Sequence, residues 1–126
     1  MFILGVALAT IVSFIASAAL YAMPRVSRLI GSQETARPGI PFVAQMLLVI
    51  LRSLMMSLLA LGLMATAGWH GAASGALLGL ALASLPAVLL LGSVVHENTP
   101  VPVAAVHFID WLVKLVVIGA LVGAFI

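Results

Sequence analysis

The sequence predicts an all-α integral membrane protein, a bundle of four transmembrane helices that forms a single domain over residues 1–126. Hydrophobic residues make up 65% of the chain and charged residues only 6%, and the mean hydropathy is +1.38. A water-soluble domain needs about a quarter of its residues charged to cover its surface. Four apolar runs also reach the ~20 residues that cross a bilayer, and lipid forces such runs to be helical. We place the helices at residues 2–23, 42–66, 71–95 and 103–125.

The first run, residues 2–23, is followed rather than preceded by basic residues. Arg25, Arg28 and Arg37 come after it, which is the reverse of a secretory signal peptide. By the positive-inside rule, the loop of residues 24–41 is cytoplasmic and both termini lie outside. We therefore expect a multi-pass protein of a bacterial inner membrane.

This loop contains more than a turn. Pro24 ends the first helix, and the apolar and basic residues of 25–30 recur at helical spacing, which predicts a short interfacial helix. Residues 31–41 contain two glycines, two prolines and several polar residues and are expected to be flexible. Pro100 and Pro102 mark the start of the last helix.

Small residues in the third and fourth runs predict close helix packing. They recur every four residues, at Gly71, Gly75, Gly79 and Ala83 and again at Gly119 and Gly123. Such stripes let helix backbones approach closely in lipid. The pattern leaves open whether the partner helix belongs to the same chain or to another subunit.

Two further features concern the shape of the bundle. Pro86 lies inside the third run, where it removes a backbone hydrogen bond and is expected to bend the helix. Residues 4–10 also parallel residues 78–84 in sequence, which suggests a duplicated two-helix hairpin, a 2+2 pseudo-repeat.

A candidate intramembrane polar cluster lies in the second and fourth runs. His107, Asp110 and Lys114 share one helical face, and Arg52 lies at a similar depth, about 15 Å or more from the cytoplasmic ends. A charge facing lipid costs about 3 kcal/mol, so we expect Arg52 and Lys114 to turn inward and share Asp110 as counter-ion. Gln45 precedes Arg52 by one heptad and is expected near the entrance, as His107 is for Lys114.

Several classes of function are disfavoured by composition. The net charge is only +2 and there is no cysteine, which argues against nucleic-acid binding, disulfides and thiol chemistry. We expect no metal, because His70 should lie at the opposite membrane face from His96 and His107. The serines at Ser13, Ser17, Ser53 and Ser57 are expected to bond backbone or neighbouring helices, so no catalytic residue and no cofactor is predicted.

Three stretches carry a resemblance to a known family. They are Tyr21-Ala22-Met23-Pro24, the Gly75-Ala76-Leu77-Leu78-Gly79-Leu80 helix, and His107-Phe108-Ile109-Asp110-Trp111 followed by Gly119-Ala120-Leu121-Val122-Gly123. In these places the chain resembles a bacterial family of small four-helix membrane proteins called domain of unknown function 1761. The resemblance implies the fold and no established activity.

The function predicted from these features is that of a structural or accessory membrane component. Surrounded by the lipid bilayer, it would assemble with itself or with a larger membrane complex through its glycine faces. The polar cluster then serves as an ion network that fixes helix register. The alternative is a small-solute, anion or proton-coupled transporter that uses the cluster as its site and acts as an oligomer. Neither hypothesis makes the protein an enzyme.

Overall fold

The computed structural model describes residues 2–33 and 39–126, and these residues are almost entirely α-helical. The helices are α1 (Phe2–Ala22), α2 (Pro24–Gln33), α3 (Phe42–Ala67), α4 (Ala72–Leu82), α5 (Ser84–His96) and α6 (Val101–Ala124). Four spans are long and apolar enough to cross a membrane: α1, α3, α4 continued by α5, and α6. The predicted all-helical, four-span fold is therefore confirmed, with ends shifted by only one or two residues.

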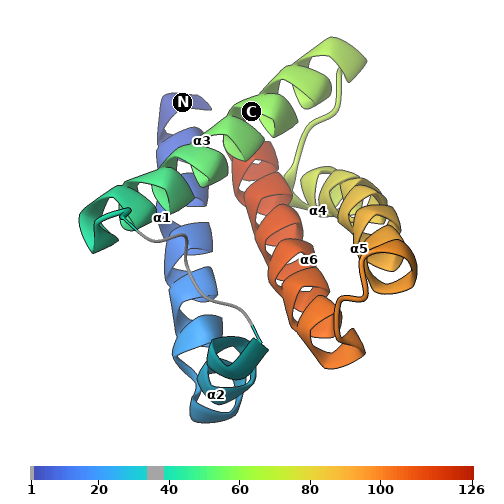
Figure 1. Cartoon of the computed structure of the whole chain (residues 1–126). Helices are drawn as coiled ribbons and strands as arrows, with labels where there is room; N and C mark the ends of the chain where they lie inside the picture. Colours follow the sequence, from blue (N-terminus) through green and yellow to red (C-terminus); the bar gives the residue numbers. More distant parts are fainter. Residues whose placement is uncertain (1, 34–38) are drawn as a thin grey trace.

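The last helix, α6, is the centre of the bundle and contacts each of the other five helices. Figure 1 shows α1 and α6 running side by side, with α3 crossing both of them near the end where the two chain termini lie. A small apolar core forms at this end, made of Val6, Ala9, Ala60, Met64, Ile118 and Val122. The short helix α2 lies at the opposite end of α1 (Figure 1).

The predicted short helix of the first loop is present as α2. Its basic residues Arg25 and Arg28 are exposed, while the apolar residues Val26, Leu29 and Ile30 are half-buried. The helix extends to Gln33, so the expected flexible segment does not begin at Gly31. Residues 34–38, which include Arg37, lie outside the described part of the chain.

The glycine stripes pack against each other, α4 on α6. A Cβ atom added to Gly75 would fall on the carbonyl oxygen of Gly119, and one added to Gly79 would fall on that of Leu115. In the other direction, a Cβ on Gly119 would meet the Gly75 carbonyl oxygen and one on Gly123 would meet that of Gly71. The question that the sequence left open is settled, because the stripe is an internal surface and is not available to another subunit.

Gly71 differs from the other members of the stripe because it lies just before α4. Its φ is +89°, which favours glycine, and its N–H donates to the carbonyl of Gly123 at 3.0 Å. Gly68, with φ +72°, ends α3 in the left-handed conformation. The tight connection from α3 to α4 thus depends on two glycines and is tied to the end of α6.

The third span is interrupted one turn before Pro86, at the place where the sequence predicts a bend. Helix α4 ends at Leu82 and α5 begins at Ser84, with Ala83 between them. Pro86 has no N–H to donate to the Leu82 carbonyl, which interrupts the helical hydrogen bonds one turn before the proline. Ala83 is 3% exposed and closes the small-residue stripe at this interruption. The 2+2 duplication of hairpins stays a prediction.

Candidate functional site

A cavity of about 410 Å³ lies among α1, α3, α5 and α6. We call it the charged cavity, and its lining residues are Ser17, Tyr21, Val49, Arg52, Leu90, His107, Asp110, Trp111 and Lys114. Four of the nine come from α6, where spacings of three and four residues put His107, Asp110 and Lys114 on one side of the helix. Three of the four charged or titratable residues predicted for the cluster come from this face, and Arg52 comes from α3.

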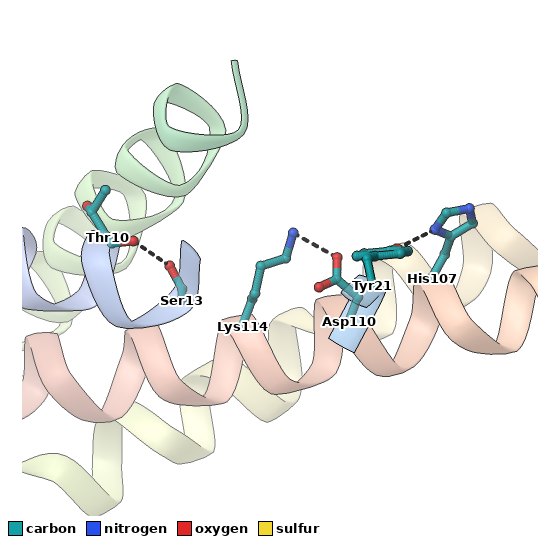
Figure 2. Close-up of polar contacts among 6 residues, drawn as sticks. All are labelled: Thr10, Ser13, Tyr21, His107, Asp110 and Lys114. Carbon is teal, nitrogen blue, oxygen red and sulfur yellow. Dashed lines mark hydrogen bonds and ion pairs between the residues drawn. The ribbon is translucent and has the colours of Figure 1, made fainter. Parts of the chain in front are cut away.

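The central interaction of the cavity is an ion pair between Lys114 and Asp110. The Lys114 Nζ lies 2.8 Å from Asp110 Oδ2, and both residues are 5% exposed. The two side chains are one helical turn apart on α6, so the backbone already holds them in reach of each other (Figure 2). The direct pairing predicted from the sequence is confirmed.

The second carboxylate oxygen of Asp110 is unsatisfied. Oδ1 is buried and accepts no hydrogen bond from any residue of 2–33 or 39–126. A buried acceptor without a donor costs about 1–3 kcal/mol. Asp110, which lines the charged cavity, therefore has an oxygen that a hydrogen-bond donor would stabilise.

Arg52 lines the cavity but is exposed, unlike the buried Lys114, so the predicted inward turn is met in full only by Lys114. Arg52 also does not share this carboxylate, so the predicted role of Asp110 as a common counter-ion is wrong. Among the described residues the only ion pair of Asp110 is with Lys114. The Arg52 guanidinium instead lies 5.1 Å from the centre of the Trp111 ring, and the Lys114 Nζ lies 4.2 Å from the same centre. Lys114 holds Asp110 from within α6, whereas Arg52 must reach it from another helix. The predicted packing of α3 against α6 is nevertheless present.

Tyr21 and His107 form the part of the cavity nearest α2. The Tyr21 hydroxyl oxygen lies 2.6 Å from His107 Nδ1, and the two rings are 5.9 Å apart (Figure 2). The sequence alone did not connect Tyr21 with His107. The available signal was that both residues lie in the halves of α1 and α6 that are nearer to the α2 end of the bundle.

Gln45 does not take part in the site. Its side-chain amide donates to the Ile40 carbonyl at 3.1 Å, at the exposed start of α3, and it does not line the charged cavity. The prediction that Gln45 is a polar residue at the entrance of the site is therefore wrong. An amide near a helix start can reach the carbonyl groups of the segment before the helix, and here it donates to one of them.

A row of buried hydroxyls continues from the charged cavity between α1 and α3. Its members are Thr10, Ser13, Ser17, Ser53 and Ser57. Thr10 Oγ1 donates to the Val6 carbonyl at 2.8 Å and Ser57 Oγ to the Ser53 carbonyl at 2.8 Å. Thr10 and Ser57 also approach each other across the helices at 3.4 Å. The expectation that the serine hydroxyls bond backbone or a neighbouring helix is confirmed for Ser13 and Ser57, while Thr10 was not anticipated.

The charges of the cavity do not balance. Two cations, Arg52 and Lys114, face one carboxylate, Asp110, so the cavity carries an excess positive charge with His107 neutral. Isolated charges at membrane depth are costly, and a bound ion of opposite sign lowers that cost. The arrangement is suited to an anion. The described residues contain no group of three His, Asp or Glu side chains that could hold a metal ion.

Comparison with known proteins gives one match. The model of a family described as "Protein of unknown function (DUF1761)" matches residues 4–123. No curated protein and no solved structure matches the chain. The matched region includes all of the charged cavity and both glycine stripes.

Proposed function

This chain belongs to the DUF1761 family of proteins of unknown function, and on the charged cavity we propose that it binds a small anionic solute within the membrane and carries it across. The observation that carries the proposal is the charge imbalance of the cavity. Lys114 already has a carboxylate partner, whereas Arg52 faces the same space with only the Trp111 ring beside it among the described residues. A guanidinium offers several N–H donors in a planar fork that fits an oxyanion.

The depth of the cavity favours a free solute over a lipid headgroup. At 1.5 Å per residue, Asp110 and Lys114 lie about 14 Å and about 20 Å along α6 from its start at Val101. A lipid phosphate belongs to the polar boundary of the bilayer and would have to sink by most of a leaflet to reach them. A small solute with one negative group reaches this depth without dragging acyl chains.

An accessory role in a larger membrane complex is the second candidate. The glycine faces that suggested it are occupied within the chain, so a partner would need another surface. Helix α5 offers one, because none of its residues is buried and it contacts only α4 and α6 among the described helices. A stable complex that survives purification and includes other polypeptides would favour this role, and an oligomer of this chain alone would favour the carrier. Both candidates are non-enzymatic.

The carrier proposal is tested by anion flux into vesicles that contain the purified protein. The probes are nitrate, inorganic phosphate and methanesulfonate. Arg52→Gln should lower the flux of the transported probe at least about tenfold, since a charge-assisted hydrogen bond contributes about 1.5–3 kcal/mol. Arg28→Gln removes the same charge from the exposed surface of α2 and should leave flux unchanged. Equal flux in the two variants, or no flux of any probe in the unchanged protein, would contradict the proposal.

The orientation in the membrane is part of the same proposal. We propose that α2 lies on the cytoplasmic side of a bacterial inner membrane, supported by its exposed Arg25 and Arg28. The chain has no cysteine, so single cysteines report sidedness without background. A membrane-impermeant maleimide added outside should label His70→Cys and spare Ser27→Cys. The opposite pattern would reverse the orientation.

A further inference from the structure

Two groups at the wall of the charged cavity lack a matching partner among the described residues. One is the Arg52 guanidinium, which has no carboxylate beside it, and the other is Asp110 Oδ1, a buried acceptor without a donor. A negative charge would pair with Arg52, and a hydrogen atom would satisfy Asp110 Oδ1. We infer that the charged cavity takes up its anion together with a proton, which resides on Asp110 Oδ1. This inference rests on the proposed function and deepens it.

The step involves a single proton and no other bond change. The Asp110 carboxylate accepts one proton from water at Oδ1, and the new O–H donates to an oxygen of the anion. Lys114 keeps all its protons. Because protonated Asp110 no longer carries a full negative charge, the Lys114 ammonium can also attract the anion. The three residues carry one net positive charge when empty, and the same net charge after uptake of one proton and one monovalent anion.

The proton and the anion support each other because they share one small space. Without the proton, the anion would lie in a low-dielectric cavity with a carboxylate that bears the same sign of charge. The carboxylate of Asp110, which lines this space, would then meet the anion as another acceptor. With the proton in place, Oδ1 changes from a repelling acceptor into a donor, and the cavity offers the anion three donor groups: Arg52, Lys114 and Asp110.

The other titratable groups around Asp110 define the competing explanation. Tyr21 faces it from α1, Arg52 from α3, and His107 and Lys114 from α6 itself. Helix α5 contributes only Leu90 to the cavity wall and α4 has no titratable residue. His107 is the rival proton site because its imidazole can also take up a proton. The experiment must therefore separate Asp110 from His107.

The first measurement is the proton count on the unchanged protein. Binding of methanesulfonate, which stays ionised throughout, is followed by calorimetry in two buffers of different ionisation enthalpy between pH 5 and 8. We expect close to one proton taken up per anion, and an affinity that falls by about tenfold per pH unit where Asp110 is ionised. Binding without proton uptake would overturn this inference and leave the proposed function standing. Absence of binding at every pH would overturn both.

The second measurement identifies the proton site. Asp110→Asn places an N–H donor where the protonated carboxyl would be, so binding should persist with no proton uptake and no pH dependence. His107→Gln should keep the full uptake, as should Glu97→Gln, which removes an exposed carboxylate outside the cavity. Loss of uptake in His107→Gln would assign the proton to His107 and overturn the inference. If Asp110→Asn does not fold, full uptake in His107→Gln still supports Asp110, and absent uptake still overturns it.

Discussion

The two sides of α6 differ in how closely they pack against neighbouring helices. Toward α4, Gly119 and Gly123 bring the helix into backbone contact with its neighbour and leave no space for a single added carbon. Toward α1 and α3, the same helix carries Asp110 and Lys114 beside a cavity of about 410 Å³. In lipid the hydrophobic effect does not hold helices together, so close packing must supply the attraction.

The difference shows how a small bundle can keep a polar cavity at membrane depth. On the glycine side, the α6 backbone lies directly against the α4 backbone at the glycines. The polar side keeps a cavity that is lined by the Lys114–Asp110 ion pair and by Arg52. Stability is therefore expected to depend on the glycines and on the Lys114–Asp110 pair, and much less on Arg52.

The largest effect should come from breaking the buried ion pair. Lys114→Met leaves the Asp110 carboxylate buried without its cation and should lower the free energy of unfolding by about 3–5 kcal/mol. Unfolding in mixed micelles with increasing sodium dodecyl sulfate measures it. Arg52→Met should change stability by less than about 1 kcal/mol, since only a contact with Trp111 is lost. Equal losses in the two variants would mean that Arg52 does share the carboxylate.

A smaller loss is expected on the glycine side. Gly119→Ala places a methyl group on the Gly75 carbonyl oxygen, and the helices must separate, at a cost of about 1–3 kcal/mol. The controls are Gly62→Ala in α3 and Gly92→Ala in α5, where an added Cβ meets nothing within 4 Å. They should be neutral or gain up to about 1 kcal/mol from helix propensity. A neutral Gly119→Ala would show that α4 and α6 are not in backbone contact.

The smallest effect concerns the hydroxyl row between the two sides. Ser57→Ala removes the buried group that meets Thr10 across the helices and should cost about 0.6 kcal/mol, the average for interhelical hydrogen bonds in a membrane protein. Ser93→Ala is the matched control, because its hydroxyl bonds only the Leu89 carbonyl of its own helix, in an exposed position. The same unfolding assay applies, and a cost in Ser93→Ala as large as in Ser57→Ala would remove any role of the cross-helix contact.

The fold could be predicted because span length and hydropathy are properties of single segments. The shared face of His107, Asp110 and Lys114 was predictable for the same reason, since helical spacing alone determines it. The helix that packs against the glycine stripe could not be predicted, because the spacing of small residues describes one helix surface and does not say which helix covers it.

Arg52 and Gln45 show where the reasoning fails. Depth along a helix places a residue at a level of the membrane, but its direction around the axis depends on how helices pack. Arg52 reaches the cavity and stops at the Trp111 ring, and Gln45 turns back to the Ile40 carbonyl. Tyr21 and His107 are 86 residues apart in sequence, so their contact becomes evident only from the three-dimensional arrangement of α1 and α6.

The missing backbone bond at Pro86 has a mechanical consequence. The proline nitrogen cannot donate a hydrogen bond to the Leu82 carbonyl. The junction of α4 and α5 at Ala83 therefore has one backbone hydrogen bond fewer than an uninterrupted helix and can serve as a pivot. A tilt of α5 about that pivot shifts Leu90, the only residue it contributes to the cavity wall, and leaves the glycine seam between α4 and α6 undisturbed. Helix α5 can thus change its tilt while α4 stays packed against α6.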